Sequence, residues 1–108
     1  MAKYISLVSF TEEGFKQIRE TAKRARAFRE SAKRQNVDIK ETFWTIGQYD
    51  IFHLFEAPSH AAAASIAYGL GSMGKCRTIT LRAFSEQEMS SILADAYDLH
   101  VTEGSVKE

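Results

Sequence analysis

The chain has 108 residues, of which 44% are hydrophobic and 26% charged, and its formal net charge at pH 7 is zero. These values predict one soluble globular domain and argue against a general nucleic-acid or anionic-membrane binder, which would need a surplus of Lys and Arg. The single cysteine, Cys76, excludes an internal disulfide and a cysteine-rich metal site, and it favours a reduced, cytoplasmic setting. Residues 1–10 lack the apolar core and cleavage site of a signal peptide. No apolar run approaches the roughly 20 residues of a membrane helix.

The first elements are a strand and a long helix. Residues 3–10 are rich in β-forming side chains and predict a strand. Thr11 can cap the helix that follows, because its hydroxyl can accept from a free amide of the first turn. Apolar residues then recur at helical spacing over residues 12–35, and Asn36 can end this helix.

A hairpin follows, with strands predicted over residues 37–46 and 49–57. Gly47 and Gln48 form a two-residue loop with glycine first, which is typical of a type II′ turn because that position needs a positive φ. The strands on both sides are rich in aromatic and aliphatic residues, so we expect the hairpin to lie at the centre of the core.

The last part of the chain predicts a helix, a strand and a short helix. Ser59 can cap a helix that begins near His60, and residues 75–84 alternate apolar and polar side chains as a strand does. Ser85 and Glu88 form a capping-box pattern ahead of the short helix. Residues 97–108 are polar and without a period, so we expect a loose tail.

This order of elements, βαββαβ plus a terminal helix, predicts an α+β ferredoxin-like domain over residues 1–96 and a polar tail over residues 97–108. Its four-stranded antiparallel sheet would carry both long helices on one face. The other face would be bare in a monomer, although both residue sets of the hairpin strands contain large apolar groups. Such a patch is unusually large for an exposed surface. We therefore expect a homodimer or a higher oligomer.

The segment from Trp44 to Asp50 resembles the signature of GYD-domain proteins. The family is named for a Gly-Tyr-Asp pattern, which here is Gly47, Tyr49 and Asp50 with one residue inserted.

Residues 1–14 and 77–84 are also similar to that family, and the likeness covers roughly residues 1–93. The resemblance implies a small ferredoxin-like domain akin to the dimeric α+β barrels, and it implies no settled activity or catalytic residues. Two positions depart from the family pattern. Thr21-Ala22 stands where Ser-Pro is expected, which suggests a more continuous first helix, and His53 stands where a small apolar residue is expected.

Strand alternation sorts the residues of the hairpin between the two faces of the sheet. Trp44, Tyr49 and His53 share one face, and Glu41 and Asp50 share the other. We expect the first of these faces to be the open one, because polar groups are costly to bury beneath helices. The His53 ring would be buried among apolar neighbours on this face, which predicts that the pKa of His53 lies below the usual 6.5. Asp50 and Tyr49 are expected, with Gly47, to shape the turn.

The open face would then carry an aromatic-walled cleft with a few polar groups, which is typical of a small-molecule site. On the fourth strand, the side chains of Ile79 and Leu81 would point toward the helices. The residues expected to form the cleft are Tyr4, Ser6, Thr42, Trp44, His53, Thr80 and Arg82.

Three functions are consistent with this cleft. The first is a homo-oligomer that binds a small molecule there. The second is a cofactor-free oxygenase or isomerase, with His53 as catalytic base and Arg82 binding an anionic group. The third is an interaction module, in which the same face is only a contact between copies. The three histidines are scattered without ligand spacing, so we expect no metal and no cofactor.

Other motifs favour simpler interpretations. The G-x-G-x-x-G pattern of residues 69–74 closes a helix instead of opening one, which indicates a helix stop and turn, not a nucleotide site. Basic residues crowd residues 16–34, but acidic residues among them favour a solvated helix face over a nucleic-acid patch. Cys76 is expected to pack as a small apolar side chain.

Overall fold

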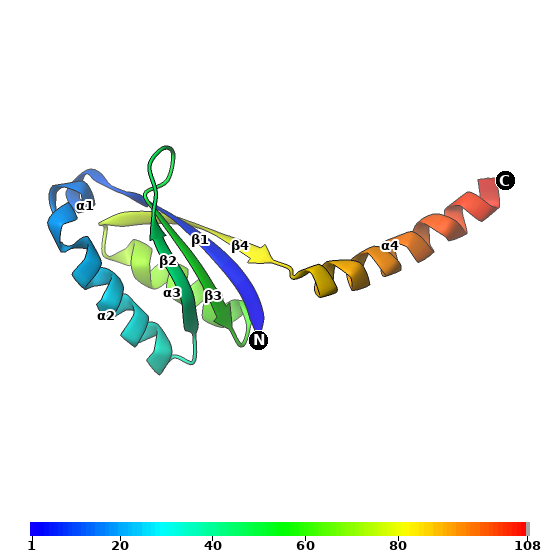
Figure 1. Ribbon diagram of the computed structural model, residues 1–108, viewed down its shortest axis with the longest axis horizontal. Helices are drawn as coiled ribbons and strands as arrows, with labels where there is room; N and C mark the ends of the chain where they lie inside the picture. Colours follow the sequence, from blue (N-terminus) through cyan, green and yellow to red (C-terminus); the bar gives the residue numbers. More distant parts are fainter. Residues whose placement is uncertain (108) are drawn as a thin grey trace.

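Four strands form one antiparallel sheet in the computed structural model, which describes the backbone of residues 1–107 and the side chains of residues 1–96. In chain order the strands are β1 (Ala2–Phe10), β2 (Asp38–Trp44), β3 (Ile51–Ala57) and β4 (Cys76–Ala83), and their order across the sheet is β2-β3-β1-β4. Two long helices, α2 (Thr21–Arg34) and α3 (His60–Ser72), lie over one face of the sheet (Figure 1). This arrangement confirms the predicted ferredoxin-like α+β fold.

Alternation along the central strand β1 decides which side chains meet the helices. Tyr4, Ser6 and Val8 are buried on the helix-covered face. Ile5 and Leu7 alternate with them and therefore point to the opposite face. β1 thus presents side chains to both faces of the sheet.

The hairpin of β2 and β3 pairs Trp44 with Ile51 and Glu41 with Leu54, which is the register that a two-residue loop at Gly47 and Gln48 predicts. A bulge then shifts the pairing, so that Ile39, not Lys40 as the simple alternation predicts, lies opposite Phe55. The extra residue allows Ile39 to be buried in the core while Lys40 stays exposed.

The first helical region is broken, contrary to the continuous helix predicted. It consists of α1 (Glu12–Lys16), the 3-10 turn η1 (Ile18–Glu20) and α2. Gly14 packs against the backbone just before β4, and a Cβ at this position would lie 1.9 Å from the carbonyl oxygen of Lys75. Thr11 donates its backbone N–H to the same oxygen at 3.1 Å. Because α1 is held there, the chain leaves helical geometry at Gln17 before α2 can lie over the sheet.

The other end of α2 follows the prediction. Asn36 has a positive φ of 64° and donates its N–H to Lys33, while Val37 donates to Ala32 at 2.9 Å. These two bonds form a Schellman motif, which satisfies carbonyls at the helix end and directs the chain into β2.

The core lies between the sheet and the two helices. Phe55 and Tyr4 stack with their ring centroids 5.4 Å apart, and small side chains of α2 and α3 approach them. Its buried members are Tyr4, Ala32, Val37, Ile39, Phe55, Ala57, Ala63 and Ile66.

The predicted capping box opens the last helix, α4 (Glu86–Lys107). Ser85 donates its N–H to the Glu88 carboxylate at 2.9 Å, and Glu88 donates its N–H to Ser85 Oγ at 3.1 Å. The bond from Ser85, together with Arg82, lowers the pKa of Glu88 to about 2. α4 leads away from the sheet (Figure 1).

The end of α4 corrects the expectation of a short helix and a loose tail. The helix continues through Lys107, and only Glu108 lies outside the described residues. The sole proline of the chain is Pro58, so no proline stops this helix, and the lack of an apolar period does not by itself oppose helical backbone.

The uncovered face of the sheet is apolar at its centre. Phe43 is 54% exposed, Ile79 is 47% exposed and Leu81 is 44% exposed. Ile79 and Leu81 therefore point away from the helices, which is the reverse of the prediction. We call this surface the open sheet face; its apolar residues are Ile5, Leu7, Phe43, Phe52, Leu54, Ile79 and Leu81.

Candidate functional site

A cavity of about 570 Å³ lies between α2, α3 and the sheet, and we call it the interhelical cavity. Val8 and Ile51 of the sheet form part of its floor, and Phe28, Ile66 and Leu70 belong to its apolar walls. A concave, mostly apolar space with a few polar groups is the usual form of a small-molecule site.

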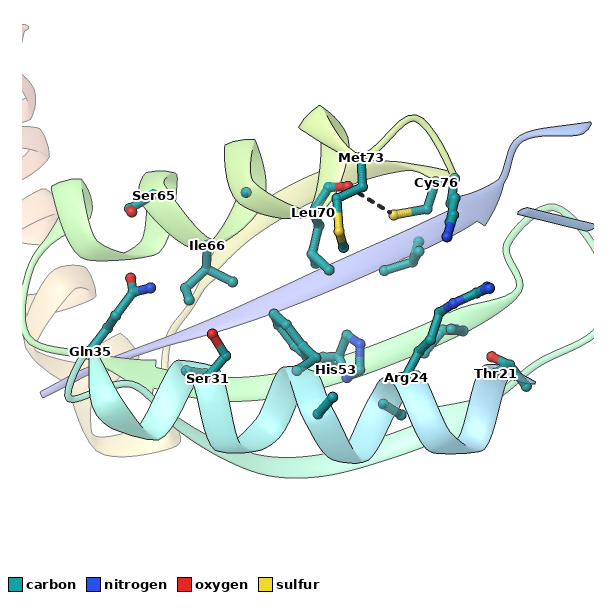
Figure 2. A pocket seen from close by; sticks show the side chains of 18 of the residues that line it. Thr21, Arg24, Ser31, Gln35, His53, Ser65, Ile66, Leu70, Met73 and Cys76 are labelled. Atoms are coloured by element: carbon teal, nitrogen blue, oxygen red, sulfur yellow. Dashed lines mark hydrogen bonds between the residues drawn. The ribbon is translucent and has the colours of Figure 1, made fainter. Parts of the chain in front are cut away.

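Polar groups are distributed along the length of the interhelical cavity (Figure 2). Thr21, Arg24 and Cys76 lie at one end, and Gln35 and Ser65 lie at the other. His53 lies between these ends, behind α2 in the view of Figure 2.

His53 is the one ionisable group that β3 contributes to the cavity lining. Its side chain is 4% exposed, and its ring centroid lies 5.1 Å from that of Phe28. Burial, and then the positive charge of Arg29, lowers the pKa of His53 from 6.5 to about 4. The imidazole is therefore neutral at pH 7, which confirms the predicted direction of the shift.

The two ring nitrogens of His53 have different surroundings. Nδ1 lies 3.0 Å from Thr42 Oγ1, within hydrogen-bond distance. Nε2 has no hydrogen-bond partner among the described residues. Every side-chain nitrogen there that is closed off from solvent does have a partner. Nε2 therefore retains solvent access, and it can donate to or accept from a molecule in the interhelical cavity, depending on the tautomer.

Arg24 brings a positive charge to the wall of the interhelical cavity. Its guanidinium donates to the side-chain amide oxygen of Gln17, a neutral partner. Lys75 and Arg34 also line the cavity, and none of the described lining residues is Asp or Glu. The electrostatic environment therefore favours neutral or negatively charged molecules.

Cys76 also lines the interhelical cavity, where it is a packed, protonated thiol. Its Sγ donates to the carbonyl oxygen of Leu70 at 3.6 Å, and burial raises the pKa of the thiol. A thiol held in this form is a poor nucleophile, which agrees with its interpretation as a small apolar side chain.

The predicted cleft residues share one face of the sheet, but that face is covered by the helices and is not the open one. Ser6 and His53 are opposite each other and both are buried. Trp44 donates its Nε1–H to Thr21 Oγ1 of α2 at 3.0 Å, which places it on the helix side as well. The prediction failed because the burial of His53 is offset by its hydrogen bond to Thr42 and by its access to a cavity.

α3 separates Tyr4 and Thr80 from His53. They line a shallow groove on the β4 side of α3, where the Tyr4 hydroxyl lies 2.6 Å from Nδ1 of His60. Neither residue lines the interhelical cavity, and His53 is the one member of the predicted cleft that does.

Arg82 also lies apart from His53. Its guanidinium donates to the Glu88 carboxylate at 3.0 Å and lies 4.5 Å from the centroid of the Phe84 ring. It is not among the residues that line the interhelical cavity. The predicted pairing of a His53 base with an Arg82 anion site is therefore not formed.

The residues of the predicted turn hold the hairpin to β1. Gly47 has a positive φ of 119°, as predicted. The two strands are shorter than predicted at the turn, so residues 45–50 form the connection between them. Asp50 accepts from the N–H of Phe10 at 2.8 Å and donates its own N–H to Val8 at 2.8 Å. Thr45 Oγ1 donates to the carbonyl oxygen of Tyr49 at 2.7 Å.

Sequence reasoning missed Phe28, Leu70 and Met73 as cavity residues, because their helical spacing indicated only core packing. Arg24 was visible as one of the basic residues of the first helix. It can be recognised as a cavity residue only once α3 is placed across from it.

Among the described residues, no three His, Cys, Asp or Glu side chains gather closely enough to hold a metal ion. No helix there combines the length and apolar character needed to cross a membrane.

Comparison with known proteins identifies a family for most of the chain. The family model described as the GYD domain matches residues 4–93 of the chain. No curated protein and no solved structure is similar enough to match it.

Proposed function

This chain belongs to the GYD domain family, and we propose that it binds a small molecule in the interhelical cavity. The observation that carries this proposal is a cavity of about 570 Å³ whose apolar wall contains one neutral histidine with a free ring nitrogen. Cavities of this size and polarity are typical of small-molecule sites.

Binding is favoured over acid–base catalysis by the state of His53. A general base works best when its pKa is near the operating pH, whereas the pKa of His53 is lowered to about 4. Arg82, the proposed partner for an anionic group, is occupied by Glu88. His53 therefore serves to orient a ligand through a hydrogen bond.

We further propose that two copies of the chain pair through the open sheet face. Its apolar centre is flanked by charges of both signs, including Lys3, Arg77, Glu41 and Glu56. A surface of this kind is complementary to itself, as a two-fold interface requires. The reduced thiol of Cys76 is consistent with a cytoplasmic location.

A neutral fluorescent probe tests the cavity directly. N-phenylnaphthylamine fluoresces when it enters an apolar site, and we expect saturable binding to the whole protein. Gly69 lines the interhelical cavity and has open space at its Cβ position, so Gly69→Phe should fill the cavity and reduce probe binding at least about tenfold.

Gly71→Phe is the matched control. Gly71 lies in the same helix, also has open space at its Cβ, and lines the groove on the other side of α3. We expect this variant to bind the probe as the unmodified protein does. The proposal is wrong if the unmodified protein does not bind the probe, or if the two variants lose binding equally.

A further inference from the structure

We infer that the ligand of the interhelical cavity is an organic carboxylate with an apolar body, and that its carboxylate lies at the Arg24 end. This inference rests on the proposed function, because it names the chemical class that the same cavity accepts.

The first argument is an imbalance of charge. Arg24, Arg34 and Lys75 line the cavity, and no acidic side chain is among its described lining residues. Arg24 donates to the neutral amide of Gln17, and neither Arg24 nor Lys75 forms an ion pair within the part of the chain that the structure describes. The cavity wall therefore carries positive charge that no carboxylate of the described residues pairs with.

The second argument is the position of Arg24 relative to the apolar wall. Its side chain lies at the end of the cavity shared with Thr21 and Cys76, while Leu70 and Ile66 of α3 lie across the cavity and further from that end (Figure 2). A molecule with a charged head at Arg24 would thus lay its apolar body along these residues. The planar guanidinium matches a carboxylate with two parallel hydrogen bonds, which a point charge cannot provide.

Burial distinguishes Arg24 from Arg34. Arg24 is half-buried, whereas Arg34 is exposed and lies ten positions further along α2, roughly 15 Å away. Water and salt screen an exposed charge more strongly than a partly buried one. Lys75 adds a second positive charge at the Arg24 end of the cavity, because it immediately precedes Cys76 and its backbone is held by Thr11.

Displacement of N-phenylnaphthylamine by ligands that share one chain length tests the inference. Decanoate, decanol and decyltrimethylammonium carry a negative, a neutral and a positive head group on the same apolar chain. We expect decanoate to displace the probe with a Kd roughly tenfold lower than that of decanol, and decyltrimethylammonium to bind most weakly of the three. Trp44, the only tryptophan, bonds to Thr21 in the cavity wall and gives an independent fluorescence signal.

Arg24→Met locates the head group, since it removes the charge and keeps an apolar side chain of similar length. We expect it to abolish the preference for decanoate over decanol, and the ratio of the two affinities measured on the same variant is the readout. Arg26→Met is the matched control, because Arg26 is an exposed residue of α2 that does not line the cavity.

Each remaining outcome overturns the inference. Equal displacement by decanoate and decanol would rule out an anionic ligand, while binding of the probe itself would still support the cavity. Loss of the preference in Arg34→Met but not in Arg24→Met would place the carboxylate at the opposite end. If Arg26→Met lowered the preference for decanoate as much as Arg24→Met does, the preference would come from the general positive charge of the surface and not from the cavity.

Discussion

At the scale of single residues, His53 shows how burial and access are combined in this domain. Thr42 holds one ring nitrogen, Phe28 covers the ring, and the other nitrogen remains open to the interhelical cavity. A lone histidine under helices would ordinarily be costly to bury. Here the neutral form and the Thr42 hydrogen bond offset that cost.

We predict that His53 titrates near pH 4 in NMR spectra of the folded protein, well below the 6.5 of an unfolded chain. A folded pKa below the unfolded value means that the folded state binds fewer protons. The stability contributed by neutral His53 is therefore complete above about pH 6.5 and is lost as pH falls toward 4, at about 1.4 kcal/mol per pKa unit. Titration of His53 near 6.5 would show that the ring is not buried as described.

The same linkage predicts the behaviour of a variant that cannot be protonated. The free energy of unfolding of His53→Gln, measured with urea, should fall less between pH 6.5 and 4 than that of the unmodified protein. An equal decline in both proteins would assign the acid sensitivity to other groups.

At the scale of elements, contacts between distant segments change what local sequence favours. The long amphipathic pattern of residues 12–35 favours one helix, yet the contact of Gly14 with the Lys75 backbone fixes α1 and the break at Gln17 follows. No side chain larger than hydrogen fits between these two segments.

We predict that Gly14→Ala destabilises the protein, because its Cβ would lie 1.9 Å from a backbone oxygen that cannot move aside alone. The expected loss in the free energy of unfolding is about 1–3 kcal/mol, as for overpacking in a core. Chemical denaturation measures it.

Gly69→Ala is the control for this substitution. Gly69 is also helical but has nothing within 4 Å of its Cβ position, so alanine there should be neutral or stabilising by up to about 1 kcal/mol. If both variants were equally stable, the close packing of α1 against the start of β4 would be contradicted.

At the scale of the whole molecule, the sheet presents two unlike faces. The helix-covered face carries the core and the interhelical cavity, and the open sheet face carries exposed Phe43, Ile79 and Leu81. Soluble monomers rarely expose a contiguous apolar surface of this extent, and this is the physical basis of the proposed pairing of two copies.

We predict that the protein sediments at about twice the mass of its 12.2 kDa chain, and that Leu54→Arg converts it to a monomer. Leu54 lies at the centre of the open sheet face, opposite Ile5, where a buried unpaired charge would be costly. Ile46→Arg is the control, since Ile46 is fully exposed in the loop before β3. A stable species of 12.2 kDa for the unmodified protein would contradict the pairing.

The sequence by itself determined the elements and most of their ends. The hydroxyl of Thr11, the capping box of Ser85 and Glu88, and the helix end at Asn36 act within a few residues, so they can be predicted from local pattern. The hairpin register from Trp44 to Glu41 follows in the same way, because alternation and a short connection leave few pairings open.

The tertiary structure alone decided which face the helices cover and where a ligand could fit. Alternation sorts His53 and Leu54 onto opposite faces, but both residue sets contain large apolar groups, so their hydrophobicity does not choose between them. The choice depends on how α2 and α3 pack over β1 and β3. The interhelical cavity depends on the spacing of the same helices, since Arg24 of α2 and Leu70 of α3 line it from opposite sides although they are distant in the sequence.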